Sequence, residues 1–330
     1  MAPAGESRQR SDGSEESLNF HSFVTEFWPS TVDGLVLGSI YALFALGYTM
    51  VYGVLKLINF AHSEVFMVGT MAVLGVLTIL GIHSQLGGGE LVGVLVVCVL
   101  VAMAASGFTA VLLERVAYRP LRRRGSSRLA ALISAIGASF VLQEIFGIWY
   151  TRDAVELPNL MGNKTVFKIG SAAVTSDDLL VVIAGVVMMI ALERLVATTK
   201  FGRGIRAVAQ DPETSTLMGV NLDRIIVYTF LIGGLMAGVA ATLYGVHYHQ
   251  TRYDIGQLPG IKAFTAAVVG GIGNLRGALI GGLVIGLLEF YGSSLFGSQW
   301  ENPVVFVVLV VVLLFRPSGL LGESLSRARA

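Results

Sequence analysis

Several apolar runs, each close to or above about 18 residues, constrain the fold of this chain more than any other feature. A helix of that length spans the apolar core of a bilayer, because it rises about 1.5 Å per residue. Hydrophobic residues make up 54% of the 330 residues and charged residues only 14%, which lies outside the usual range of soluble domains. The sequence therefore predicts an all-α, polytopic transmembrane helical bundle of about eight membrane segments.

The first residues differ from the rest of the chain. Residues 1–17 are polar and rich in Ser, Glu and Arg, which predicts a disordered tail. Aromatic and apolar residues then recur at helical spacing before Pro29: Phe20, Phe23, Val24, Phe27 and Trp28. This pattern predicts a short helix at the membrane interface, so that 1–31 form a tail and an interfacial segment. The alternative is that these residues are the first turns of the span at 32–51.

Polar residues interrupt the apolar pattern at 52–64 and predict a broken or re-entrant element there. Three of them are candidates for a substrate pathway, namely Asn59, His62 and Glu64. Ionisable side chains near membrane depth are costly unless they face protein or water. They can line a passage or tie a broken helix to its neighbours, and the second interpretation is favoured.

A second interruption lies at 260–277, where glycines break the run too early for a full crossing. Gly271, Gly273 and Asn274 are the further pathway candidates. Irregular backbone at membrane depth is stable only where protein or water satisfies its polar groups. One interruption in each half is typical of a transporter built from repeats, with the pathway between them.

Basic residues predict which loops are cytoplasmic, since such loops carry an excess of Lys and Arg. The loop after the third apolar run holds Arg115, Arg119, Arg122, Arg123, Arg124 and Arg128. The loop at 198–224 and the C-terminal tail at 323–330, with Arg316 before it, are also basic. A cytoplasmic C-terminus needs an even number of crossings after Ile225, so the glycine-broken segment counts as more than one pass, or a pass has been missed.

The most prominent polar stretch is the loop at 198–224, and its second half predicts a short capped helix. Asp211 suits the N-cap, Pro212 the first helical position and Glu213 the first turn, while Gly219 can close the other end. Such a helix between two spans is suited to contact another protein, or it is a solvated connector.

No enzyme motif is present in the sequence. The phosphate-binding loop GxxxxGK[ST], HExxH and GxSxG are all absent. His247 and His249 have no acidic or Cys partner near them in sequence, so no metal site and no cofactor are expected. The net charge of +1 gives no reason to expect nucleic acid. A partner-driven permease, an ion-coupled secondary carrier and a passive channel remain, and Glu64, Glu144 and Glu289 are the acids that a carrier could use.

Several segments resemble the membrane permeases of branched-chain amino acid ABC transporters, the shorter permease of the usual pair in particular. They are GLVLGSIYALFALGYTMVYGVLKLINFAHSEVFMVG (34–69), ERVAYRPLR (114–122), FGRGIRAVAQDPETSTLMGVN (201–221), AFTAAVVGGIGNLRGALIGGLVIGLLE (263–289) and RPSGLLG (316–322). The resemblance implies a permease domain at 32–322 in a bacterial inner membrane. It implies no enzyme activity in this chain.

The resemblance also implies partners. The chain would form half of the translocation pathway for a branched-chain or related small amino acid, beside a second permease that is homologous or identical to it. Two cytoplasmic ATPases and an external substrate-binding protein would complete the importer, although close relatives carry urea or short-chain amides. Permeases of this class carry a coupling helix with the pattern EAA---G, of which Glu213 and Gly219 match while Thr214 and Ser215 do not. The implied ATPase contacts are Asp211, Pro212, Glu213, Leu217, Met218 and Gly219.

Overall fold

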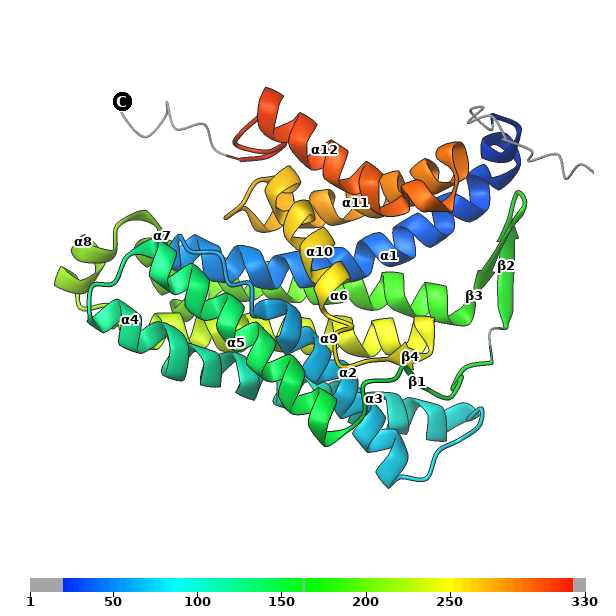
Figure 1. Ribbon diagram of the computed structural model, residues 1–330, viewed down its shortest axis with the longest axis horizontal. Helices are drawn as coiled ribbons and strands as arrows, with labels where there is room; N and C mark the ends of the chain where they lie inside the picture. Colours follow the sequence, from blue (N-terminus) through cyan, green and yellow to red (C-terminus); the bar gives the residue numbers. More distant parts are fainter. Residues whose placement is uncertain (1–19, 163, 323–330) are drawn as a thin grey trace, which may run out of the picture.

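The computed structural model describes residues 20–322 except residue 163, and it is almost entirely helical (Figure 1). The first half contains α1 (Phe20–Leu55), α2 (His62–Ile79), α3 (Gly88–Leu113), the π-helical turn η1 (Glu114–Tyr118), α4 (Arg119–Arg123) and α5 (Arg128–Trp149). The second half contains α6 (Ser176–Thr198), α7 (Lys200–Gln210), α8 (Pro212–Leu217), α9 (Leu222–Tyr248), α10 (Gln257–Gly270), α11 (Leu275–Phe296), the short turn η2 (Ser298–Trp300) and α12 (Glu301–Phe315).

Eight of the described helical stretches are long and apolar enough to cross a membrane. They contain α1, α2, α3 with α4, α5, α6, α9, α11 and α12. The predicted polytopic helical bundle of about eight segments is therefore confirmed. The apolar runs of the sequence form helices because a segment in lipid must satisfy its backbone hydrogen bonds within itself.

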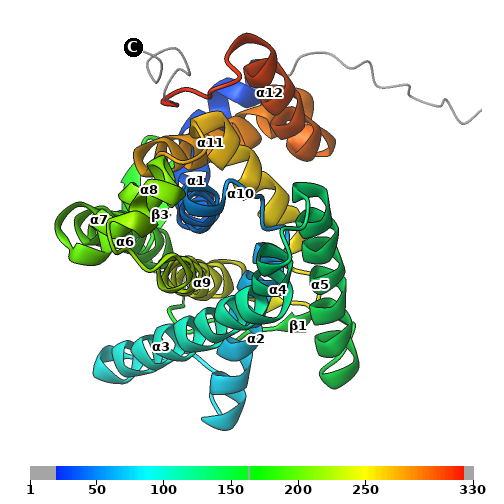
Figure 2. The same ribbon diagram turned by 90° about the vertical axis from the view of Figure 1, so that its left-hand side faces the viewer.

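Helix α1 is the centre of the bundle. Seen from one end in Figure 2, it is surrounded by α6, α9, α10 and α11, and its most apolar stretch is almost wholly buried. Helix α3 packs against α9 and α2, whereas α5 and α12 lie at the margins with most of their side chains exposed. Those apolar outer faces are suited to lipid or to another membrane subunit.

The separate interfacial helix predicted before Pro29 is wrong, because α1 runs without a break from Phe20 through Pro29. Two aromatic residues near its start contact a neighbouring helix, although Phe27 and Trp28 remain partly exposed. Phe27 stacks on Tyr291 of α11 with ring centroids 5.6 Å apart, and Phe23 meets the same ring edge-on. The predicted tails at 1–17 and 323–330 lie outside the described residues.

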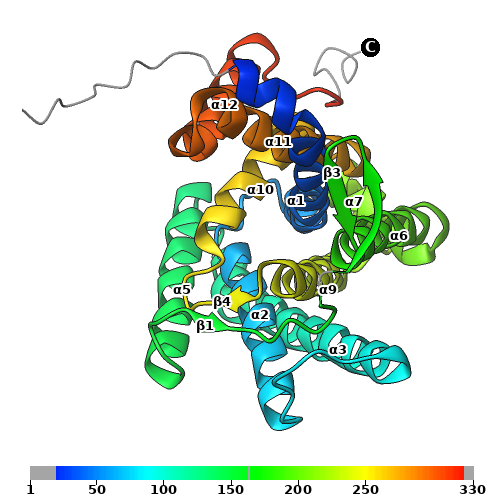
Figure 3. The ribbon, with the colours of Figure 1, turned by 90° about the vertical axis from the view of Figure 1, so that its right-hand side faces the viewer.

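Four short strands, which the helical prediction did not include, lie at one end of the bundle (Figure 3). β1 (Val155–Glu156) pairs with β4 (Gln250–Thr251), and β2 (Thr165–Ile169) forms a hairpin with β3 (Ala172–Thr175). The first pair joins the connection after α5 to the connection after α9.

The two predicted interruptions are present. The first is the non-helical stretch between Leu55 and His62, and the second is the turn at 271–274 between α10 and α11. Helix α10 has 14 residues and is about 21 Å long, which is shorter than the bilayer core of about 30 Å. A partial pass by α10 would give the even number of crossings that a cytoplasmic C-terminus requires.

The described C-terminal residues lie at the same end as α7 and α8. Leu320 N donates to Val269 O at 2.8 Å, which places the chain after α12 beside the end of α10. At the start of α11, Arg276 bonds Glu193 near the end of α6, from which α7 follows. The fold is thus consistent with the prediction that the loop at 198–224 and the C-terminal residues lie on the same side of the membrane.

Candidate functional site

The first interruption places Asn59 in a buried contact between the α1–α2 connection and η1. Asn59 Oδ1 accepts a hydrogen bond from the Tyr118 hydroxyl at 2.8 Å, and both side chains are buried. Asn59 Nδ2 has no hydrogen-bond partner among the described residues. The π-helical turn brings Tyr118 to this position, and such turns are frequent at functional sites.

His62 begins α2 and is held within an aromatic group. Its ring lies 5.3 Å from the Phe44 ring and 4.8 Å from the Tyr48 ring, measured between centroids. The side chain is 1% exposed, and its Nε2 has no partner among the described residues. This atom faces Gly47, where no side chain larger than hydrogen fits without displacement.

Glu64 joins three helices through a buried polar cluster. Its Oε1 accepts hydrogen bonds from Ser63 Oγ at 3.1 Å, Ser139 Oγ at 3.0 Å and Gln143 Nε2 at 2.8 Å. Gln143 Oε1 in turn accepts from Gln257 Nε2 at 3.3 Å, at the start of α10. These hydrogen bonds connect α2, α5 and α10, in line with the interpretation that the polar residues attach a broken helix to its neighbours.

We expect Glu64→Leu to lower the free energy of unfolding by about 2–3 kcal/mol, because the buried Gln143 amide and the half-buried Ser139 hydroxyl lose their acceptor. Denaturation of the purified chain in detergent measures this change. Glu144→Leu is the matched control on α5, since Glu144 is exposed and pairs with exposed Arg152, and it should change stability by less than about 1 kcal/mol. Equal losses for the two variants would contradict the tying role of Glu64.

The second interruption is closed by the C-terminal turn at 316–322. Gly271 and Gly273 adopt φ values of +109° and +98°, which side chains disfavour. Asn274 Oδ1 caps α11 by accepting from Arg276 N at 3.0 Å, while its Nδ2 donates to Leu321 O at 2.9 Å. Leu321 N also donates to Gly270 O at 3.0 Å. No local pattern in the sequence indicated that the C-terminal turn completes this break.

The two interruptions lie side by side, although no hydrogen bond between described residues joins their predicted pathway residues. Ile58 of the first and Ile272 of the second line the same small hollow, together with Tyr48 and Phe264. A larger hollow of about 360 Å³ opens beside it. Its lining combines apolar and aromatic residues with two cations, and consists of Tyr52, Lys56, Leu57, Ile58, Arg128, Leu129 and Leu132.

The capped helix predicted in the 198–224 loop is present as α8, and a second helix, α7, precedes it. Asp211 Oδ1 accepts from the backbone N–H of Glu213 at 3.0 Å and of Thr214 at 3.2 Å. Hydrogen bonds from the Thr214 side chain and from these amides lower the pKa of Asp211. The charged cap therefore persists at neutral pH and weakens only as the pH falls below about 4, where aspartate in an unfolded chain begins to protonate. Gly219 ends the helix with φ +86°.

Leu217 and Met218 are the most exposed apolar side chains of this loop, with 86% and 82% of their surface accessible. Ser215, on the opposite side of α8, is buried. Helix α8 thus presents an apolar tip away from the bundle.

An ion-pair network that the sequence did not reveal fixes the loop to the preceding helices. Asp223, at the start of α9, pairs with Arg119 at 3.0 Å, Arg122 at 2.6 Å and Arg123 at 3.2 Å. Arg122 also bonds the fully buried carboxylate of Glu114 at 3.1 Å. The arginines that indicated a cytoplasmic loop therefore also connect α4 to α9. In the sequence, the sign of this contact was an acidic residue, Asp223, at the end of the basic loop at 198–224.

The other acids considered for ion coupling have different surroundings. Glu289 forms a buried ion pair with Lys262 at 2.7 Å, and Lys262 also lies 3.4 Å from Glu301. Glu144 is exposed and pairs with Arg152 at 2.6 Å.

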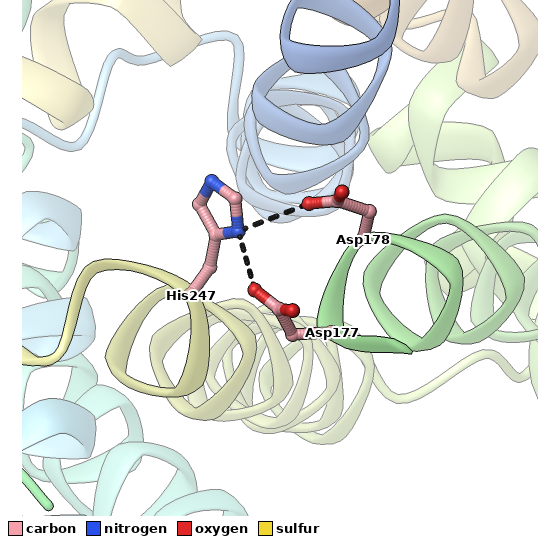
Figure 4. A group of neighbouring side chains, drawn as sticks. All are labelled: Asp177, Asp178 and His247. Carbon is pink, nitrogen blue, oxygen red and sulfur yellow. Dashed lines mark hydrogen bonds and ion pairs between the residues drawn. The ribbon is translucent and has the colours of Figure 1, made fainter. Parts of the chain in front are cut away.

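His247 has acidic partners after all, and they come from a distant part of the chain. Asp177 and Asp178 at the start of α6 face its Nδ1 (Figure 4). Seventy positions in sequence separate Asp177 from His247, so spacing alone could not indicate the contact. No acid lies close to His247 in sequence, as stated above, but two acids lie next to it in the folded chain.

Comparisons with known proteins agree with this architecture. Residues 30–314 match the family described as branched-chain amino acid transport system, permease component. The chain is 40% identical over 297 residues to the high-affinity branched-chain amino acid transport system permease protein BraD of Pseudomonas aeruginosa, covering 88% of this chain and 94% of BraD. It is 41% identical over 303 residues to the corresponding permease LivH of Escherichia coli K12, covering 90% and 96%.

A more distant relative is the probable branched-chain amino acid transport permease protein LivM of Methanocaldococcus jannaschii. It is 26% identical over 330 residues, covering 86% of this chain and 91% of LivM. No solved structure matches significantly. The match to the family over most of the chain and the 40% identity to its members show that this chain belongs to the family of branched-chain amino acid transport permeases.

Proposed function

We propose that this chain is the permease subunit that forms half of the pathway of an ABC importer for branched-chain amino acids. Its partners would be a second, related permease, two ATPases and an external binding protein. The observation that carries the proposal is α8, a capped helix with an apolar tip on the basic end of the bundle. The end with α8 and the C-terminal turn would face the cytoplasm of a bacterial cell.

The contacts around α8 suit transmission of movement from an ATPase to the membrane helices. Helix α8 follows α6 through α7 and leads directly into α9, so displacement of α8 acts on two membrane helices. The ion pairs of Asp223 with Arg119 and Arg122 extend this connection to α4 and α3. A rigid element joined to several helices in this way can convert a local movement into a rearrangement of the bundle.

The pathway would pass near the two helix interruptions, with Asn59, His62 and Glu64 beside it and Gly271, Gly273 and Asn274 at its inner end. The larger hollow has an apolar wall that suits an aliphatic side chain, and Lys56 and Arg128 that suit a carboxylate. The exposed face of α5 would meet the second permease. These features support a small amino acid as the transported solute.

If the ATPase binds to the apolar tip of α8, it should no longer bind to a variant that carries Leu217→Glu and Met218→Glu. Two exposed apolar anchors would become charged, and burying those charges at an interface should weaken binding by about 2 kcal/mol or more, roughly 30-fold. The measurement is the amount of ATPase that co-purifies with the affinity-tagged chain in mild detergent.

Val166→Glu is the matched control, because Val166 is also exposed and apolar but lies on β2 before α6, at the other end of the bundle. It should retain the ATPase at the level of the unchanged protein. Equal ATPase recovery with the Leu217→Glu, Met218→Glu variant, in a chain of unchanged stability, would refute docking through α8.

A further inference from the structure

Three side chains of types that can bind metal ions lie together between the start of α6 and the end of α9 (Figure 4). They are Asp177, Asp178 and His247, and we refer to them as the α6–α9 cluster. His247 Nδ1 lies 3.2 Å from Asp177 Oδ2 and 3.5 Å from Asp178 Oδ1. Nitrogen and oxygen ligands at about 2.0–2.2 Å from a tetrahedral zinc ion stand about 3.3–3.6 Å apart. The two distances from Nδ1 are close to that range, and all three ligand atoms lie within 4.8 Å of one another, so a cation could bind once the side chains draw closer together.

The three side chains do not satisfy one another on their own. A histidine ring nitrogen carries at most one hydrogen, yet two carboxylates face the same Nδ1. Asp177 points toward His247 in Figure 4, its side chain is only 5% exposed, and its Oδ1 is buried with no hydrogen-bond partner among the described residues. An unpaired oxygen on a buried carboxylate is costly, and a bound cation would compensate for it.

The charges of the cluster also favour a divalent cation. Asp33 of α1 is a third carboxylate close enough to interact electrostatically with Asp178 and His247. The N-terminus of α6 contributes only a partial positive charge against these carboxylates. A divalent cation would balance two of these negative charges.

Asp178 is already oriented by a second set of contacts. Its Oδ2 accepts hydrogen bonds from Thr175 N at 2.9 Å and from Thr175 Oγ1 at 2.5 Å. This capping interaction leaves Oδ1 directed toward His247. Hydrogen bonds of this kind, which fix the free oxygen of a ligating carboxylate, are a regular feature of protein metal sites.

We propose that the α6–α9 cluster binds a divalent cation of the zinc class. Imidazole nitrogen and carboxylate oxygen are both zinc ligands, whereas calcium prefers six to eight oxygens. The bound cation joins the start of α6 to the end of α9, at the end of these helices opposite α8. This site is independent of the proposed transport function, because its contacts lie within one chain.

The test is zinc binding by the full-length chain, purified through a tag without histidines and stripped with EDTA. Zn²⁺ is titrated in competition with a chromophoric chelator, and bound zinc is counted by elemental analysis. The variants are His247→Gln and Asp177→Asn, and His83→Gln is the matched control, since His83 is exposed in the connection between α2 and α3. Co²⁺ in place of Zn²⁺ reports the ligand geometry through its visible absorption.

We expect one tightly bound zinc ion per chain in the unchanged protein and in His83→Gln, with at least about 10-fold weaker binding in both cluster variants. The visible bands of bound Co²⁺ should disappear in the same two variants. Absence of stoichiometric zinc from the unchanged protein would overturn the proposal, as would unchanged affinity in Asp177→Asn and His247→Gln. The cluster would then be an ordinary ion pair.

Discussion

Gly286→Ala is expected to destabilise the chain by about 3 kcal/mol or more, although it adds only one methyl group. Helices α1 and α11 are in direct backbone contact at this position. A methyl carbon at residue 286 would stand 2.4 Å from Gly34 O and 2.5 Å from the Cα of Gly38. Backbone atoms cannot move aside as a flexible side chain can, so the central helix would have to separate from α11.

The measurement is the free energy of unfolding in detergent, supported by the amount of folded protein that accumulates in the membrane. Gly93→Ala on α3 is the control, because a methyl group there meets no atom of the described residues within 4 Å. It should be neutral or stabilising by up to about 1 kcal/mol, from the better helix propensity of alanine. Similar stabilities for the two variants would show that α1 and α11 are not in contact as described.

The second large effect is expected for Lys262→Met, which removes one partner of a buried ion pair. The side chains of Lys262 and Glu289 are 6% and 2% exposed, and Tyr41 donates a further hydrogen bond to Glu289 at 3.4 Å. Loss of the ammonium leaves the buried Glu289 carboxylate without its cationic partner, which costs about 3–5 kcal/mol. Unfolding in detergent should show a loss of this size.

Two comparisons make this prediction specific. The double variant Lys262→Met, Glu289→Gln should recover most of the stability, because the unpaired charge is then absent. Arg276→Met breaks the largely exposed pair with Glu193 and should cost less than about 1 kcal/mol. A loss for Lys262→Met no greater than that for Arg276→Met would mean that Glu289 is not held as a buried anion.

The sequence predicted those parts of the fold that depend on local chemistry. Apolar runs longer than about 18 residues identified the spans, since only a helix satisfies such a backbone in lipid. Asp211, Pro212 and Gly219 identified α8, because capping requires particular residues at fixed positions. The interruptions around Asn59 and Gly271 were recognised because polar residues and glycines replace the apolar pattern.

The features that the sequence did not predict depend on contacts between distant segments. Pro29 is accommodated within α1, where aromatic neighbours pack on Tyr291 of α11. The C-terminal turn closes the α10–α11 break through Leu320 and Leu321, and Asp177 reaches His247 across seventy positions. Local patterns carry no information on such pairs. The sequence could therefore single out the individual residues but could not show which distant residues they contact.

ATP-driven import by this chain is tested by leucine uptake into proteoliposomes that contain this chain, the second permease and the ATPases, with the binding protein on the side opposite α8. For a permease driven by ATPase partners, radiolabelled leucine uptake should require ATP hydrolysis on the α8 side, persist with proton and sodium ionophores, and be lost in the Leu217→Glu, Met218→Glu variant. Uptake that follows an imposed proton or sodium gradient without the ATPases would contradict ATP-driven import and identify an ion-coupled carrier.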